Sequence, residues 1–167
     1  MLKVPLKVKI LKDLTRTSDS GLEQLWLQIQ HKHLKSVVAC IVYRPPDCAL
    51  SCLADDLMPS HTQALSLNKL IVLTGDLNCD LLVYNPRGDA LRTFCTAVNA
   101  TQLIKDPTRV TRSSFTLIDI VLTSDSSLVK DSDVVDVTIS DHSVFGLCSF
   151  GLKDTQIQII LYHHPQL

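Results

Sequence analysis

Residues 70–78 read Leu-Ile-Val-Leu-Thr-Gly-Asp-Leu-Asn, an apolar run followed at once by a polar loop. The run predicts a short buried strand over residues 70–73, and Gly75 lets the loop turn sharply. Asp76 and Asn78 are two positions apart, so on an extended chain their side chains point to the same side. A carboxylate beside a carboxamide suits a hard cation, or an attacking water and the phosphate that it strikes. An Asx-rich surface turn is the alternative interpretation.

The sequence before this stretch predicts three successive strands with short connections, which favours an antiparallel meander. The first segment alternates in the way typical of a half-buried strand, with lysines Lys3, Lys7 and Lys9 on one side and apolar residues on the other, namely Val4, Leu6, Val8 and Ile10. Residues 12–21 form a turn, and residues 22–30 form the second strand. Residues 36–43 are a continuous Val- and Ile-rich run that fits a strand buried on both faces. Pro45-Pro46 ends it, and Asp47 can cap a helix with apolar residues at helical spacing, namely Leu50, Leu53, Ala54 and Leu57.

The sequence after the stretch predicts one more helix and three more strands. The helix presents one apolar face and ends near Asn99. Residues 106–114 are a polar loop, and residues 116–122, 134–139 and 144–150 are strand-like. Strands therefore dominate, and the Gly-rich turn of dinucleotide-binding folds is absent. We predict an α/β fold, a layered sandwich of mostly antiparallel β-sheets flanked by helices. One domain is expected over residues 1–152, with a C-terminal tail over residues 153–167.

Two further polar clusters lie in or after predicted strands. Asp119 lies inside the apolar residues 116–122, where a buried carboxylate needs a partner such as a histidine. On a solvated edge it would need none. Ser140-Asp141-His142-Ser143 follows the strand at residues 134–139. There Asp141 could bind a metal while Asp119 orients His142, although a surface turn has the same composition.

Composition and charge narrow the classes of function. The formal net charge is −1, so contact with nucleic acid would depend on a local basic patch or a bound metal. No apolar run approaches the roughly 18 residues of a membrane span, and the first residues lack the apolar core of a signal peptide. The cysteines contain no Cys-x-x-Cys pair, so we interpret them as reduced thiols of an intracellular protein.

Four motifs occur in a fixed order, each within a strand or at its end: Tyr43-Arg44-Pro45-Pro46, Gly75-Asp76-Leu77-Asn78, Thr116-Leu117-Ile118-Asp119 and Ser140-Asp141-His142. Together they resemble the endonuclease domain of LINE-type non-LTR retrotransposons. That domain is a branch of the superfamily of endonucleases, exonucleases and phosphatases that includes DNase I. The loop at residues 107–111 also looks like this branch, and the resemblance extends from about residue 7 to residue 150.

The resemblance implies a DNase I-like fold and a phosphodiesterase that nicks DNA with Mg²⁺ or Mn²⁺. Carried over by position, Asp76 would align or deprotonate the attacking water, and Asn78 would hold the scissile phosphate. His142, paired with Asp119, would stabilise the charge that develops on the phosphate. Tyr43 would contact the phosphate or support the leaving group.

The resemblance also implies a metal site and contacts with DNA. Asp141 would hold the metal together with Asp76 and Asn78. DNA-phosphate contacts are plausible for three arginines, which on a loop would otherwise be solvated: Arg44, Arg109 and Arg112. A reverse transcriptase domain fused downstream is a further implied partner. Localisation would be nuclear if the protein functions on DNA.

The sequence departs from the family pattern in its N-terminal part. The family has more chain before the Tyr43 motif, an Asn on its first strand, and a Glu that is the principal metal ligand. Neither motif is present, and Glu23, the only glutamate, matches a different strand. These departures predict an N-terminally truncated domain with weak activity or none. The alternatives are a non-catalytic remnant that binds DNA or a partner, and a phosphate-ester hydrolase of the same superfamily. The Tyr43 motif argues against the last.

Overall fold

The computed structural model describes residues 7–30, 36–67, 69–135, 145–152 and 155–160, with side chains up to residue 129. The strands of the main sheet and its helical connections are β1 (Lys7–Ile10), β2 (Arg16–Thr17), β3 (Glu23–Gln30), β4 (Val37–Tyr43), η1 (Leu53–Leu57), α1 (Met58–Leu65), β5 (Leu70–Asp76), α2 (Pro86–Ala97), β6 (Thr101–Gln102) and β9 (Asp119–Thr123). The remaining elements are β7 (Arg109–Val110), β8 (Phe115–Thr116), η2 (Ser126–Leu128), β10 (Val129–Val135), β11 (Phe145–Leu152) and β12 (Thr155–Ile160).

The main sheet has seven strands in the order β1-β3-β4-β5-β9-β6, with β2 paired to β3. The meander predicted from the sequence is confirmed, because β1 pairs with β3 and β3 with β4 in antiparallel register. The pair β4–β5 is parallel, and η1 and α1 make the crossover between its strands. β9 then pairs antiparallel with both β5 and β6. This arrangement brings the ends of β4 and β5 and the start of β9 together.

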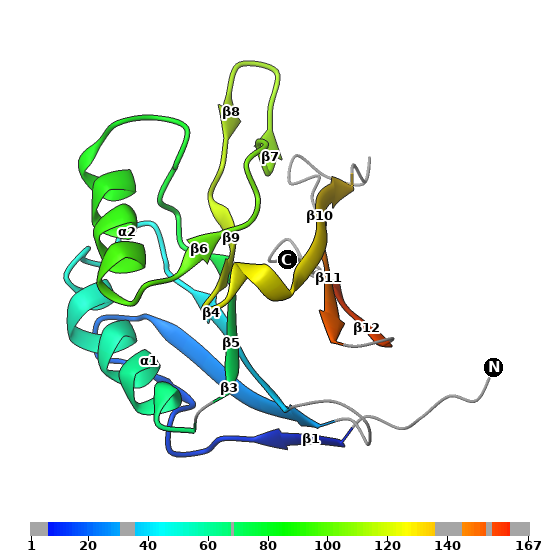
Figure 1. Cartoon of the computed structure of the whole chain (residues 1–167). Coiled ribbons are helices and arrows are strands. Elements are labelled where there is room, and N and C mark those ends of the chain that lie inside the picture. The colour runs from blue at the N-terminus through cyan, green and yellow to red at the C-terminus, as the bar shows by residue number, and fades with distance from the viewer. Residues whose placement is uncertain (1–6, 31–35, 68, 136–144, 153–154, 161–167) are drawn as a thin grey trace.

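The elements form layers, as Figure 1 shows: α1 and α2 cover one face of the main sheet, and β10–β12 stand on the opposite side. Side chains alternate along each strand, so every second residue of a central strand faces the helices. The larger core lies on that side, and its members include Trp26, Val38, Cys40, Leu57, Leu73, Phe94 and Ile120. A smaller cluster on the other face contains Val37, Val72, Ile104, Leu117 and Val121. The predicted layered α/β sandwich is confirmed.

Several predicted boundaries differ from the observed ones. β5 continues to Asp76, three residues beyond the predicted strand, because residues 72–76 are paired with β4 on one side and β9 on the other. The predicted strand over residues 116–122 is interrupted, and Asp119 begins β9 instead of lying in its middle. The predicted loop over residues 106–114 contains β7, which forms a hairpin with β8.

The expected helix cap at Asp47 and the expected burial of one face of β1 are not observed. The first helical residue after β4 is Leu53, with Cys52 before it, so Asp47 caps no helix. On β1 the apolar face that was expected to be half-buried is exposed, with Val8 at 58% and Ile10 at 50%. β1 is an edge strand that pairs with β3, and neither α1 nor α2 makes extensive contact with it among the described residues.

The C-terminal part forms a second sheet of three strands in the order β10-β11-β12. β10 starts earlier than the predicted strand, at Val129, and residues 136–139 lie outside the described residues. β12 lies within the expected tail, where it pairs antiparallel with β11. Residues 155–160 therefore have a pairing strand in the fold, although their sequence did not indicate one.

His61 is buried in the larger core, and this burial makes stability depend on pH. It lies edge-on between Trp26 and Phe94, with ring centroids 6.5 Å and 6.2 Å away. Burial lowers its pKa below the usual 6.5, so below that pH the unfolded chain binds the proton more readily than the folded one. The free energy of unfolding should therefore fall as the pH drops from about 7.5 to about 5.

Urea unfolding at several pH values checks this expectation. His61→Phe keeps an aromatic ring but has no ionisable group, so its unfolding free energy should decline less over the same range. Equal declines for the two proteins would show that His61 contributes nothing to the acid sensitivity.

α2, with 12 residues, is the longest described helix. None of the described helices combines the length and the apolar character that a membrane span requires.

Candidate active site

Three of the predicted site residues lie in one row across adjacent strands. Tyr43 on β4 is in register with Asp76 on β5, and Asp76 is in register with Asp119 on β9. Residues in register on neighbouring strands project to the same face, about 4.8 Å apart from strand to strand. Glu23, exposed at the start of β3, pairs with Tyr43 and extends the row. The row lies on the face opposite the helices, at the end of the sheet where β4 and β5 finish.

Asp76 and Asn78 are held in a tight turn at the end of β5. Asp76 is only 6% exposed, and its Oδ1 accepts a hydrogen bond of 2.8 Å from the backbone N–H of Asn78. Asn78 has a φ of 49°, in the left-handed region that asparagine tolerates well. Its Nδ2 donates to the carbonyl of Arg44 over 2.9 Å. The two side chains predicted to act together are therefore both oriented by hydrogen bonds.

Arg44, a predicted phosphate contact, directly follows β4. Its side chain is 1% exposed and points into the protein, where Nη1 donates to the carbonyl of Leu77 over 3.2 Å. Its Nη2 donates to the carbonyl of Cys48. The guanidinium thus has internal partners, and its contact with a DNA phosphate stays a prediction. The sequence does not reveal whether an arginine after a strand points inward or outward.

Asp119 is held at the start of β9 by Thr108, a residue to which the sequence gave no individual role. The hydroxyl oxygen of Thr108 accepts hydrogen bonds from the N–H groups of Ile118 and Asp119, over 3.2 Å and 3.1 Å. Thr108 is 1% exposed, and its own N–H donates to the carbonyl of Thr116. Its signal in the sequence is the resemblance of the loop at residues 107–111 to the retrotransposon branch, which assigns no individual role to this threonine.

Thr108 should therefore be sensitive to loss of its hydroxyl. Thr108→Val keeps the shape but leaves two backbone N–H groups without their acceptor, and each unsatisfied donor costs about 1–3 kcal/mol. Thr108→Ser keeps the oxygen and should retain most of the free energy of unfolding, as measured by denaturant titration. A valine variant as stable as the serine variant would contradict this role.

Tyr43 is a phenol surrounded by acidic groups. Burial and then the charges of Asp76, Glu23 and Asp47 raise its pKa above the usual 10. The group therefore keeps its proton at neutral pH and can donate a hydrogen bond to an oxygen of a bound anion.

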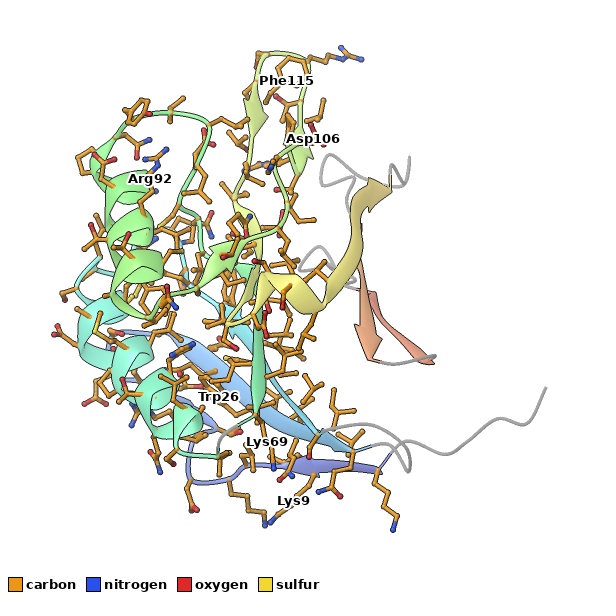
Figure 2. All side chains as sticks on the ribbon, viewed as in Figure 1. Lys9, Trp26, Lys69, Arg92, Asp106 and Phe115 are labelled. Carbon is orange, nitrogen blue, oxygen red and sulfur yellow. The ribbon has the colours of Figure 1, made fainter. Side chains whose placement is uncertain are left out.

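The other two predicted arginines lie on the hairpin formed by β7 and β8. Arg109 is partly buried on β7, and its Nε is a buried donor without a hydrogen-bond partner. Arg112 is exposed in the turn, where the N–H of Thr111 donates to the carbonyl of Ser114. Figure 2 shows that the hairpin projects away from the sheet, with Phe115 near its far end. Phe115 is 64% exposed, which makes it one of the most exposed large apolar side chains in the described part of the chain.

Asp141 and His142 lie outside the described residues, so their predicted roles stay predictions. Side chains of His, Cys, Asp and Glu do not gather in threes around a possible ion within the described part of the chain. The oxygen donors of Asp76 and Asn78 nevertheless have the chemistry that Mg²⁺ prefers, and Mg²⁺ commonly takes only one or two protein carboxylates. The residues present therefore fit a hard cation whose remaining ligands are water or phosphate.

Comparison with known proteins places this geometry in a family. The endonuclease-reverse transcriptase family matches residues 37–145, which is more than half of the chain and includes Tyr43, Asp76, Asn78 and Asp119. None of the curated proteins matches the sequence at a significant level.

Solved structures share the fold at low sequence identity. The endonuclease domain of TRAS1, a telomere-specific non-LTR retrotransposon, is 16% identical with a TM-score of 0.70, and the match covers 89% of this chain and 70% of that domain. An endonuclease/exonuclease/phosphatase family protein from Leptotrichia buccalis is 15% identical with a TM-score of 0.57, over 89% of this chain and 62% of that one. The human Nocturnin catalytic domain with bound sulfate is 12% identical with a TM-score of 0.58, and the match covers 87% of this chain and 60% of that domain.

This chain thus spans less than two thirds of the length of the last two relatives. These likenesses confirm the DNase I-like fold. With the match over residues 37–145, they show that the chain belongs to the endonuclease-reverse transcriptase family.

Proposed function

We propose that this domain is a metal-dependent phosphodiesterase that nicks DNA, derived from a non-LTR retrotransposon. The observation that carries the proposal is the row of Tyr43, Asp76 and Asp119 across β4, β5 and β9, with Asn78 fixed beside it. Membership of the endonuclease-reverse transcriptase family supports an endonuclease domain of the retrotransposon type. DNA is the proposed substrate, and a reverse transcriptase domain downstream is the proposed partner.

Asp76 is the proposed base. Its Oδ1 is held by the N–H of Asn78, so the carboxylate has one fixed orientation toward the reacting centre. A carboxylate at this position aligns the attacking water and takes up its proton. The same N–H bond prevents rotation of the carboxyl group, so the acceptor oxygen is already in place before the DNA binds.

Asn78 and Tyr43 are the proposed phosphate-binding groups. One hydrogen of the Asn78 amide is used by the carbonyl of Arg44, and the amide carries a second hydrogen. The protonated phenol of Tyr43 supplies another donor, because its raised pKa keeps the proton in place. Both donors offset negative charge on the phosphoryl oxygens in the transition state.

His142 and Asp141 complete the proposed site. His142, paired with Asp119, would hold a proton near the phosphate, and the carboxylate would fix the orientation of the imidazole. Asp141 would hold Mg²⁺ or Mn²⁺ together with Asp76 and Asn78. When bound, the cation would supply charge neutralisation for the phosphate and the leaving oxygen.

One observation favours a second candidate, a domain that binds DNA without cutting it. The only glutamate of the chain, Glu23, is exposed at the start of β3, two strands from Asp76 in the sheet. Its carboxylate therefore does not join Asp76 as a third possible metal ligand among the described residues, and a site with few hard ligands binds Mg²⁺ weakly.

The experiment that tests the proposed substrate compares two phosphate esters under the same conditions. The purified chain is incubated with Mg²⁺ and either supercoiled plasmid or p-nitrophenyl phosphate. Conversion of plasmid to open circles without release of nitrophenol is expected. Release of nitrophenol with intact plasmid would assign the domain to the superfamily branches that act on small esters. Slower migration of uncut plasmid in a gel-shift assay, which shows binding without cleavage, would favour the domain that only binds DNA.

A further inference from the structure

Arg44 is a buried cation whose partners are neutral. Its side chain is 1% exposed, and Nη1 and Nη2 donate hydrogen bonds to the backbone carbonyls of Leu77 and Cys48. Both acceptors are uncharged peptide groups and not the carboxylates that usually accompany a buried arginine. Burial of a charge without an opposite charge is costly, and an apolar side chain of similar volume would fill the space at lower cost. The contacts of the guanidinium should therefore explain why a charged side chain occupies this buried position.

Asp76, Leu77 and Asn78, the three residues of the turn at the end of β5, all form hydrogen bonds with Arg44. Its N–H donates to the carbonyl of Asp76 over 2.9 Å, and its carbonyl accepts from Nδ2 of Asn78 over 2.9 Å. Those two bonds use the backbone, so any residue at this position can make them. Only the guanidinium joins the carbonyl of Leu77 to that of Cys48, and it thereby ties the loop after β5 to the turn after β4.

The carbonyl of Leu77 and the N–H of Asn78 belong to one peptide group. Arg44 holds the carbonyl end of this peptide, and Oδ1 of Asp76 accepts from the N–H end over 2.8 Å. Because a peptide group is planar, fixing one end fixes the direction of the other.

We infer that Arg44 is a positioning residue that orients the Asp76 carboxylate through the Leu77–Asn78 peptide. The planar fork of an arginine reaches two carbonyls at once, whereas a lysine ammonium is a single point charge on a flexible stem. The role therefore requires the guanidinium and not merely a positive charge. Its effect on the reaction rate rests on the proposed function, but its effect on the peptide does not.

The test uses Arg44→Lys and Arg44→Met, with Val38→Ala as the matched control. Val38 is fully buried near the start of β4, the strand that precedes Arg44, so its truncation lowers stability without touching the turn at Asp76–Asn78. The first readout is hydrogen exchange of the Asn78 amide by NMR. Loss of one such bond corresponds to about a tenfold loss of protection, which we expect in both Arg44 variants. The amide of Ile120, on the paired strand, serves as internal reference.

The second readout is the rate of plasmid nicking. Arg44→Lys should lower kcat about tenfold and leave KM within about twofold, since misplacement of a catalytic group acts on the chemical step. Arg44→Met should lose at least as much, and if it does not fold, the lysine variant decides. Val38→Ala should keep both the protection of Asn78 and the wild-type kcat.

The outcomes separate this inference from the proposed function. If the wild-type chain does not nick DNA, the proposed function fails and hydrogen exchange alone decides the role of Arg44. Wild-type protection of the Asn78 amide in Arg44→Lys would overturn the inference, whether or not the protein is active. A kcat of Arg44→Lys equal to that of the wild type would overturn it as well.

Discussion

Replacement of Asp76 by asparagine is expected to lower the rate of DNA nicking about a thousandfold, within the range usual for loss of a general base. Asparagine has the same size and keeps an oxygen that can accept from the N–H of Asn78, so the turn should survive. What disappears is the negative charge that aligns the water and takes its proton. Initial rates on supercoiled plasmid, with thermal unfolding as a check of the fold, measure the effect.

Asp80→Asn is the matched control for this prediction. Asp80 follows Asp76 in the same loop, and its Oδ1 accepts from the N–H groups of Leu82 and Leu117, each over 3.0 Å. Asparagine can keep both of these bonds too, so the variant should nick at nearly the wild-type rate. Comparable losses in the two variants would mean that the loop as a whole is sensitive and that Asp76 has no special role.

Gly75→Ala is expected to destabilise the fold by more than about 4 kcal/mol, which is a large part of the stability of a typical domain. Gly75 has a φ of 140°, and a Cβ atom built on it would lie 1.8 Å from the backbone carbonyl oxygen of Val42. That oxygen belongs to the neighbouring strand β4, so neither strand can move away without loss of their pairing. Denaturant titration of the purified variant, or its failure to fold, measures the effect.

Gly21→Ala provides the comparison. Gly21 also has a positive φ, of 88°, but its added Cβ would approach nothing closer than Cγ of Pro45 at 3.9 Å. Backbone strain alone should then cost about 1 kcal/mol. If Gly75→Ala lowered the free energy of unfolding as little as Gly21→Ala, β4 and β5 would not approach each other closely at this point. The register that aligns Tyr43 with Asp76 would then also be contradicted.

The sequence was sufficient to predict the elements whose patterns are long and regular. The apolar residues 36–43 and 70–73 correspond to β4 and β5, and the spacing of Leu91, Phe94 and Val98 corresponds to α2. It was not sufficient for the hairpin, because β7 and β8 have two residues each and show no period. The exposed face of β1 was also unpredictable, since an amphipathic pattern does not reveal whether another layer covers it.

The candidate site shows the same division. A glycine, an aspartate and an asparagine around a strand end point to a polar site, but their register with Tyr43 and Asp119 depends on strands that are distant in sequence. Strand pairing over such distances is not encoded in any local pattern. The inward direction of Arg44 and the hydrogen bonds of Thr108 likewise depend on what packs around them. The positioning roles of these two residues were therefore apparent only in the folded structure.

The central claim is that the residues around the end of β5 form a DNA-cutting site, and nicking of supercoiled plasmid tests it most directly. The wild-type chain is compared with the double variant Asp76→Ala, His142→Ala in Mg²⁺, and with the wild type in EDTA. The account predicts open circles from the wild type in Mg²⁺ and intact plasmid in both controls. Intact plasmid after incubation with a wild-type preparation that unfolds cooperatively, and is therefore folded, would contradict it.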